Sequence, residues 1–134
     1  MPKHRSPLLT VLVVLALAPV CHAAEGGKRP SGDPGWEAFQ ARWQAAMKSG
    51  DAAAIASLTR LPFLLGGKKL DRAAFERSVP GLFTAPVRRC LARARASTEP
   101  GAPGDRVMFC TSYNFYFDSS DGQWRLREFG ADTP

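Results

Sequence analysis

The sequence predicts an α+β domain in which helices come first and a mainly antiparallel sheet follows. Apolar residues in the first half recur at spacings of three and four, as on one face of an amphipathic helix. The second half contains the run 106–117, which is rich in aromatic residues and is the strongest strand signal in the chain. The length of 134 residues allows one domain with a single core.

The first 23 residues have the three parts of a secretory signal peptide. Lys3 and Arg5 precede an apolar run over 8–18, and a short segment ending in Ala23 follows. We expect cleavage after Ala23 and export to the periplasm or the exterior. The run is about half of the roughly 20 residues that a membrane-spanning helix needs, so we expect no transmembrane segment after processing. The alternatives are an uncleaved anchor and a lipid on Cys21.

Cleavage would change the chemistry that the chain can perform. It removes Lys3 and Arg5, which lowers the formal net charge from +6 to +4, and it removes both histidines, His4 and His22. Histidine is the commonest general base and a common zinc ligand. We therefore expect no metal and no cofactor, and an enzyme would have to use carboxylates.

The folded domain is expected over 36–131, after a linker over 24–35 that is rich in glycine, proline and charged residues. A first helix, ending at Gly50, is predicted from four apolar residues on one face. They are Trp36, Phe39, Trp43 and Met47. Asp51 can cap a second helix over 52–58 because its carboxylate accepts bonds from free backbone N–H groups.

Further turn and cap signals follow along the chain. Pro62 is expected to end the second helix, and the segments 63–65 and 68–70 around a Gly-Gly turn predict a short hairpin. Asp71 can cap a third helix, which Pro80 and Gly81 are expected to interrupt.

Thr84 and Pro86 are expected to open a fourth helix. The buried face of this helix is predicted to carry Val87, Cys90, Leu91 and Ala94. Its arginines, Arg88, Arg89, Arg93 and Arg95, are expected to point elsewhere.

The sheet is predicted from the last third of the chain. A loop is expected over 97–104, one long strand over 106–117, a turn over 118–122 and a returning strand over 123–129. The odd-numbered residues of the long strand are of types that favour burial, and its even-numbered residues are also partly apolar. Because one face of a single sheet covers the helices, the other face is free for water, a ligand or a second copy, and we expect a homodimer through it.

This order of elements resembles the nuclear transport factor two-like (SnoaL-like) superfamily. The resemblance rests on the aromatic helix stripe, on Gly50-Asp51 and on the closing segment 121–126. It implies a cone-shaped domain, in which a curved, mainly antiparallel sheet wraps around the N-terminal helices and leaves a pocket on its concave side. Such domains serve as enzymes, as binding modules and as dimerisation modules.

Glu128 is the candidate catalytic residue if the protein is an enzyme. Strand alternation places it on one face with Trp124 and Leu126, where it could point into the pocket together with Tyr113 or Tyr116. Tyr113, Tyr116, Trp124 and Glu128 are therefore the candidate ligand-binding residues. The alternative is an exposed or arginine-paired glutamate.

The arginines of residues 88–95, with Lys68, Lys69 and Arg72, are a candidate site for an anionic partner. No aromatic residue is interleaved with the arginine run, which argues against nucleic acid. An anionic envelope polymer, a lipid headgroup or an acidic protein surface would fit better. The alternative is a solvated helix face.

Cys90 and Cys110 are the cysteines that remain after processing. An even number in a small exported domain favours a disulfide, and two buried free thiols are the alternative. If the bond forms, the even-numbered residues of the long strand face the helices. Phe109, Phe115 and Phe117 would then face outward.

Together these features predict an exported, non-catalytic binding or interaction module. The alternatives are a small-molecule enzyme that uses a carboxylate, and an inhibitor or immunity-type protein that binds another protein. A ligand-sized cavity lined by Glu128 and a tyrosine would favour the enzyme, whereas a filled interior would favour the other two.

Overall fold

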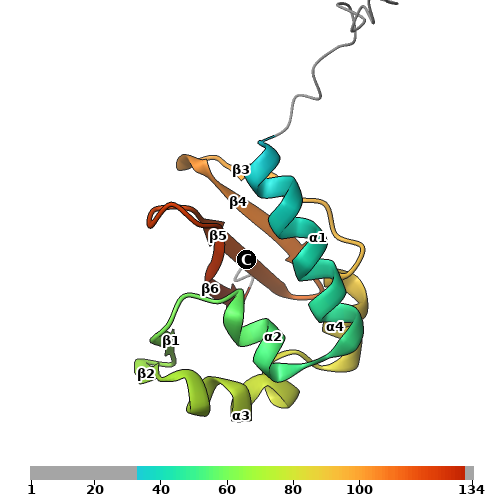
Figure 1. The fold of residues 1–134 in the computed structure, drawn as a ribbon, viewed down its shortest axis with the longest axis vertical. Coiled ribbons are helices and arrows are strands. Elements are labelled where there is room, and N and C mark those ends of the chain that lie inside the picture. Colours follow the sequence, from blue (N-terminus) through green and yellow to red (C-terminus); the bar gives the residue numbers. More distant parts are fainter. Residues whose placement is uncertain (1–32, 132–134) are drawn as a thin grey trace, which may run out of the picture. The chain divides into compact units, whose positions relative to one another are not determined.

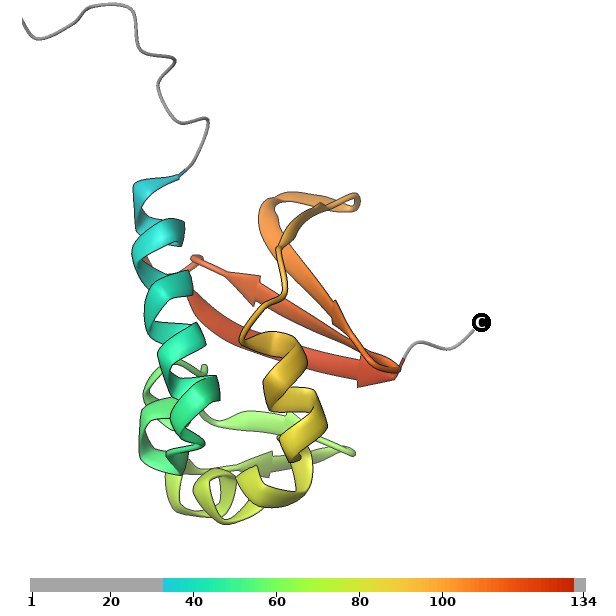
Figure 2. The same ribbon diagram turned by 90° about the vertical axis from the view of Figure 1, so that its right-hand side faces the viewer.

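The fold is an α+β arrangement of four helices and two antiparallel sheets, one of two strands and one of four, as predicted. It is given by a computed structural model that describes residues 33–131. The predicted signal peptide lies outside the described residues. Figures 1 and 2 show the helices grouped on one side of the open four-stranded sheet.

The first two helices begin and end at polar or glycine caps. Helix α1 (Pro34–Ser49) starts two residues before the predicted start, because Asp33 accepts hydrogen bonds from the first backbone N–H groups. It ends at Gly50, which has the left-handed φ of 67° typical of helix C-termini. Helix α2 (Ala52–Ser57) is capped by Asp51, as predicted.

The chain leaves α2 well before Pro62, because it turns to bond with the sheet. The backbone of Arg60 donates to Leu126, and the backbone of Leu126 donates to Leu58, both at 2.8 Å. The predicted hairpin then follows as β1 (Phe63–Leu65) and β2 (Lys68–Leu70).

Helix α3 (Arg72–Leu82) is capped by Asp71 as predicted, but it continues through Pro80 and Gly81, so the predicted interruption is wrong. Val79 and Phe83 are both 2% exposed, and the backbone of Phe83 donates to Val79 at 2.8 Å. Burial of these two side chains holds the last turn in helical form, while the exposed Pro80 loses one intrahelical bond.

Helix α4 (Ala85–Leu91) is shorter than predicted, and Thr84 makes no side-chain capping bond. Val87 and Leu91 are buried as expected, whereas Cys90 is half-buried and Ala94 lies beyond the end of the helix.

The large sheet has the order β3 (Ser97–Glu99), β4 (Ala102–Cys110), β5 (Tyr113–Asp118) and β6 (Arg125–Ala131). Two predictions are therefore wrong. The expected loop over 97–104 is a hairpin, and the expected long strand is two strands joined by a turn. Thr111, with a φ of 58°, and Ser112 form that turn. It was missed because it lacks the glycine or asparagine that usually marks such turns.

The turn changes which side chains share a face of the sheet. Cys110 pairs with Tyr113, and Met108 pairs with Phe115, so Tyr113, Phe115 and Phe117 lie on the same face as Cys110. Phe115 is 1% and Phe117 is 0% exposed against the helices, which makes their predicted outward orientation wrong. Phe109 does face outward and is 59% exposed.

Aromatic side chains fill the space between the helices and the sheet. Trp43, on α1, has ring centroids of Phe117 at 5.1 Å and of Phe83 at 6.0 Å in edge-to-face geometry. Phe39 stacks on it at 6.1 Å. Edge-to-face packing of this kind is favourable beyond the area that it buries.

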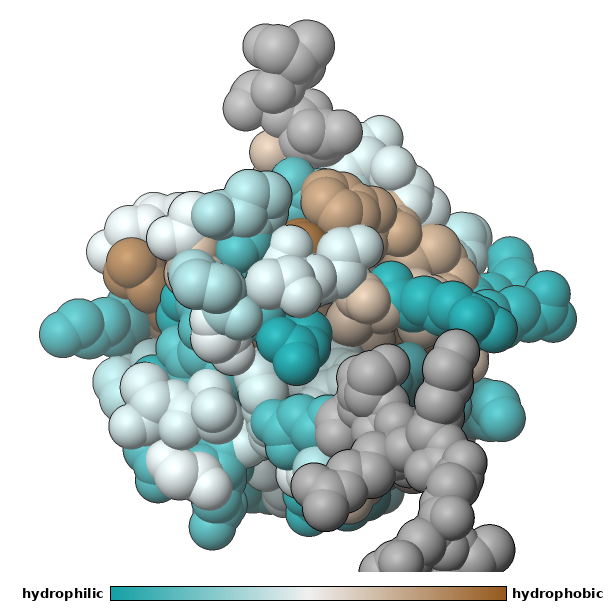
Figure 3. Space-filling model, turned by 90° about the horizontal axis from the view of Figure 1, so that it is seen from above, coloured by the Kyte–Doolittle hydropathy of each residue, from teal (hydrophilic) through white to brown (hydrophobic). Residues whose placement is uncertain are grey.

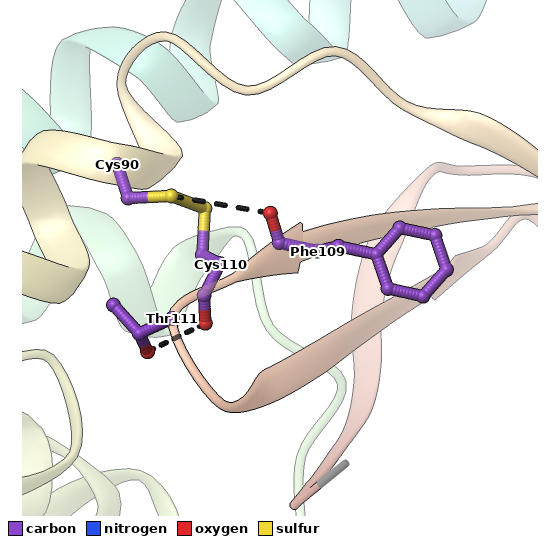
Figure 4. The surroundings of a disulfide bond; sticks show 4 residues. All are labelled: Cys90, Phe109, Cys110 and Thr111. Carbon is purple, nitrogen blue, oxygen red and sulfur yellow. Dashed lines mark hydrogen bonds between the residues drawn. A yellow bond between two sulfur atoms is a disulfide. The ribbon is translucent and has the colours of Figure 1, made fainter.

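The Cys90 and Cys110 sulfur atoms lie at bonding distance, with the two Cα atoms 5.7 Å apart. This pair joins α4 to the end of β4, next to the turn at Thr111 (Figure 4). The sulfur of Cys90 also lies 3.9 Å from the carbonyl oxygen of Phe109. The predicted pairing of these cysteines is therefore compatible with the fold.

Candidate functional site

Two adjoining hollows run beside α1 and form what we call the basic groove. One, of about 280 Å³, lies between the end of α1 and α4, and the other, of about 510 Å³, lies between α1 and the segment after α4. Arg93 lines both hollows. The polar side chains that define the groove are Gln40, Gln44, Lys48, Arg88, Arg89, Arg93 and Arg95.

The α1 side of the groove follows from helical spacing. Gln40, Gln44 and Lys48 are four residues apart, so they lie along one face of the helix. Trp43 and Met47, at 0% and 1% exposed, hold the helix against the core. The sequence had indicated the buried stripe, but it gave no signal that the three polar residues line a site.

Arg88 fixes the position of α4 against α1. It is half-buried, and its Nη1 donates to the carbonyl oxygen of Met47 at 3.1 Å. That carbonyl is in the last turn of α1, where a positive charge is favoured by the helix dipole. A Cβ on Gly50 would lie 2.6 Å from the same Nη1. Arg88 therefore has a structural role as well as adding positive charge.

The remaining cations of the groove have no ion pair within the part of the chain that the structure describes. Lys48, Arg89, Arg93 and Arg95 are all exposed, and no described carboxylate lies within 4.0 Å of them. No aspartate or glutamate of residues 33–131 lines either hollow. Within the described part of the chain, the groove is thus a concave surface whose positive charge has no acidic partner.

Four arginines outside the groove, Arg60, Arg72, Arg125 and Arg127, are paired with acids. Asp118, which is 5% exposed, pairs with Arg60 and lies 3.7 Å from Nη1 of Arg127. The same Nη1 donates to Asp105 at 2.5 Å. The sequence had assigned Asp118 only to a turn, because its partners are distant in the chain. This network ties the end of α2 to the sheet.

A separate polar hollow outside the basic groove, of about 490 Å³, adjoins that network. It is lined by Arg60, Arg72 and Arg125, but also by Asp121. The backbone N–H of Gln123, together with Arg60 and Arg125, holds the pKa of Asp121 below its usual value of 3.8. Its negative charge at neutral pH opposes the binding of an anion there.

The predicted basic cluster is therefore divided between two places. Lys68 and Lys69 lie exposed on β2, and Arg72 begins α3, where it pairs with Glu76 at 2.9 Å. None of the three lines the basic groove. The arginines of 88–95 form a site without them.

Glu128 is exposed on the face of β6 opposite to Leu126, so its predicted placement beside that residue is wrong. A register shift pairs Tyr116 with Glu128 but Phe117 with Leu126, which inserts one extra residue into β6. Glu128 lines a hollow of about 430 Å³ beside the β1–β2 turn.

Of the other three predicted ligand-binding residues, Tyr116 alone lies beside Glu128, as its partner across the strands, and it does not line the same hollow. Trp124 is 9% exposed, packs edge-to-face on Trp36 at 4.9 Å and donates its ring N–H to Asp33 at 3.1 Å. Tyr113 packs against Phe129 on the helix side, whereas Tyr116 lies on the other face below the Arg127 guanidinium.

Comparisons with known protein families, curated proteins and solved structures find no match.

Over residues 33–131, no group of three or more His, Cys, Asp or Glu side chains is placed to hold a metal ion. Within the same range, no helix has the length and apolarity needed to cross a membrane. In the view from above (Figure 3), hydrophilic residues project from the surface between smaller apolar patches.

Proposed function

We propose that the protein is an exported, non-catalytic interaction module that binds an anionic partner through the basic groove. The observation that carries this proposal is the gathering of cations that have no ion pair with any residue of the described range. Arg89, Arg93, Arg95 and Lys48 lie around one concave surface without a described acidic neighbour, whereas four arginines outside the groove are paired.

Electrostatics explains why such a groove favours a ligand. Like charges around a hollow repel one another and focus a positive potential, which attracts anions and raises their local concentration. Planar guanidinium groups bind carboxylate and phosphate groups through two parallel hydrogen bonds. An anionic partner would therefore relieve the repulsion and gain directional bonds.

The rest of the domain supports binding over catalysis. The space between helices and sheet is occupied by fully buried aromatic side chains, including Phe39, Trp43 and Phe117. Glu128 and Tyr113 lie on opposite faces of the sheet, and Tyr116, although it pairs with Glu128 across the strands, does not line the hollow that Glu128 lines. The enzyme alternative requires a carboxylate and a tyrosine in one ligand-sized cavity, and the hollow that Glu128 lines contains no tyrosine.

Two further parts of the proposal rest on the sequence. Export rests on residues 1–23, and the likeness to nuclear transport factor two-like domains rests on the order of the helices and hairpins. A homodimer through the outer face of the sheet stays a prediction, with the exposed Phe109 as its apolar contact.

The proposal is tested by comparing two variants that lose the same charge. Replacement of Arg93 and Arg95 by alanine removes two cations from the groove, whereas replacement of Lys69 and Arg77 removes two exposed cations outside it. Binding of the purified chain to polyglutamate and polyphosphate is measured by calorimetry at several salt concentrations. We expect the groove variant to bind at least about tenfold more weakly, equivalent to roughly 1.4 kcal/mol.

The control variant should lose less than about twofold, since its cations are remote from the groove. Equal losses in the two variants would mean that net charge alone attracts the polymer, and would overturn the proposal. The proposal would also be overturned if the unmodified chain bound none of the three ligands, which are polyglutamate, polyphosphate and an acidic oligosaccharide.

A further inference from the structure

We propose that the anionic partner is an acidic saccharide, a chain of sugars that bear carboxylate groups, lying along the basic groove. This inference rests on the proposed function and names the ligand class for the same site. It is carried by the chemical difference between the two ends of the groove and by the lack of accessible large apolar side chains along it.

At the end of the groove beside the C-terminus of α1, all the polar lining residues that the structure describes are cations. Lys48, Arg88 and Arg89 line the smaller hollow, with Arg93 at the junction. The larger hollow combines Arg93 and Arg95 with the side-chain amides of Gln40 and Gln44. A ligand that fills both hollows must therefore present negative charge throughout and neutral polar groups at one end.

The side-chain amides of the two glutamines favour an acidic saccharide over a polyphosphate chain. Each amide can donate and accept hydrogen bonds, which matches a sugar hydroxyl that also does both. A polyphosphate chain offers acceptors only, so it can bond to the amide N–H groups but not to the amide oxygens. An acidic saccharide supplies carboxylates for the arginines and hydroxyls for Gln40 and Gln44.

The length of the groove suits a chain of several units. From Trp36 to Lys48, α1 advances twelve residues, or about 18 Å at 1.5 Å per residue. A single small anion would contact only a fraction of the cations along this length. An extended oligosaccharide would contact them in succession.

The apolar residues of the groove argue against two other partner classes. Trp36 and Met47 line it but are only 7% and 1% exposed, and the other apolar lining residues are alanines. An amphipathic helix needs apolar pockets for its anchor side chains, and single-stranded nucleic acid needs exposed aromatic rings for stacking. The large exposed apolar residues of the described chain, Leu64, Phe109 and Tyr113, line neither hollow.

The test uses four probes with the purified chain. They are an oligogalacturonate of four units, the same oligomer with its carboxylates reduced to alcohols, a tetraglutamate and a linear tetraphosphate. At equal concentration and salt, we expect the oligogalacturonate to bind at least about fivefold more tightly than each of the others. Equal or tighter binding of the tetraglutamate or the tetraphosphate would overturn the saccharide inference.

A second measurement uses the variant in which Gln40→Met and Gln44→Met are combined. Methionine keeps the length and helix propensity of glutamine but cannot make the amide hydrogen bonds. We expect about a tenfold loss of affinity for the oligogalacturonate and less than a twofold change for tetraglutamate and tetraphosphate. Circular dichroism and thermal melting verify that the helix is retained.

The two proposals can fail separately. If the glutamine variant binds oligogalacturonate normally while the variant lacking Arg93 and Arg95 does not, the saccharide inference is wrong and the anion-binding function stands. If the arginine variant also binds normally, both are wrong.

Discussion

Gly50 meets two structural demands at the end of α1. Its φ of 67° lies in the left-handed region, and a Cβ there would lie 2.6 Å from the Arg88 guanidinium. We expect Gly50→Ala to lower the free energy of unfolding by about 1–2 kcal/mol from the backbone alone, with a further loss if Arg88 is displaced. Urea denaturation followed by tryptophan fluorescence measures the change.

Gly81→Ala is the matched control for that variant. Gly81 lies inside α3, and a Cβ there meets nothing within 4 Å. Alanine is the better helix former, so this variant should be unchanged or more stable, by up to about 1 kcal/mol. A loss of stability equal to that of Gly50→Ala would contradict the account of both glycines.

Asp33 and Asp51 make nearly the same capping bonds, but Asp33 has an additional partner. Each accepts from two backbone N–H groups, at 2.9 and 3.4 Å, while Asp33 also accepts from the Trp124 ring at 3.1 Å. Asp51→Ala should cost about 1 kcal/mol of stability. Asp33→Ala should cost roughly 1 kcal/mol more, because it also leaves the mostly buried Trp124 N–H without its acceptor.

Chemical denaturation of the two variants under the same conditions measures this difference. A change in the wavelength of tryptophan emission is expected for Asp33→Ala and not for Asp51→Ala, since of the two carboxylates only Asp33 accepts a hydrogen bond from an indole ring. Equal losses in stability would show that the bond between Asp33 and Trp124 contributes nothing.

At the scale of elements, the link between Cys90 and Cys110 joins α4 to β4 across a sequence separation of 20 residues. A bond that closes a loop of this length should stabilise the fold by roughly 3 kcal/mol on the chain-entropy model. The protein purified without reductant should melt at a lower temperature after reduction. The double variant Cys90→Ser and Cys110→Ser should not respond to reductant.

Because this link holds α4 in place, it should also affect ligand binding in the basic groove. Arg88, Arg89 and Arg93 are on or next to α4, which packs on α1 and on β4. Reduction should therefore weaken binding of an anionic probe at temperatures where the reduced domain is still folded. Unchanged affinity after complete reduction would show that packing alone holds α4 in place.

At the scale of the whole molecule, the sequence predicts that the mature protein begins at Ala24. N-terminal sequencing of the protein recovered from an exporting host tests this directly. Retention of Met1, or a lipid on Cys21, would contradict it. Thiol titration of the denatured, non-reduced protein adds an independent test, because a cleaved and disulfide-bonded chain should have no free thiol, whereas a retained Cys21 would contribute one.

The elements that could be predicted depend on residues close together in the chain. The caps at Asp51 and Asp71, the glycine end of α1 and the Gly-Gly hairpin each involve neighbours within about four residues, so composition and spacing were sufficient. Cys90 and Cys110 could be paired because they are the two cysteines that the predicted cleavage after Ala23 would leave.

Features set by distant contacts could be found only in the tertiary structure. Burial of Val79 and Phe83 overrides the helix-breaking tendency of Pro80, and the turn at Thr111 reverses a segment that reads as one strand. The groove joins polar residues of α1 with arginines that follow about 50 residues later, and no local pattern relates the two. The sequence by itself therefore determined the fold class, the caps and the expected export, while long-range packing decided the faces of the sheet and the location of the candidate site.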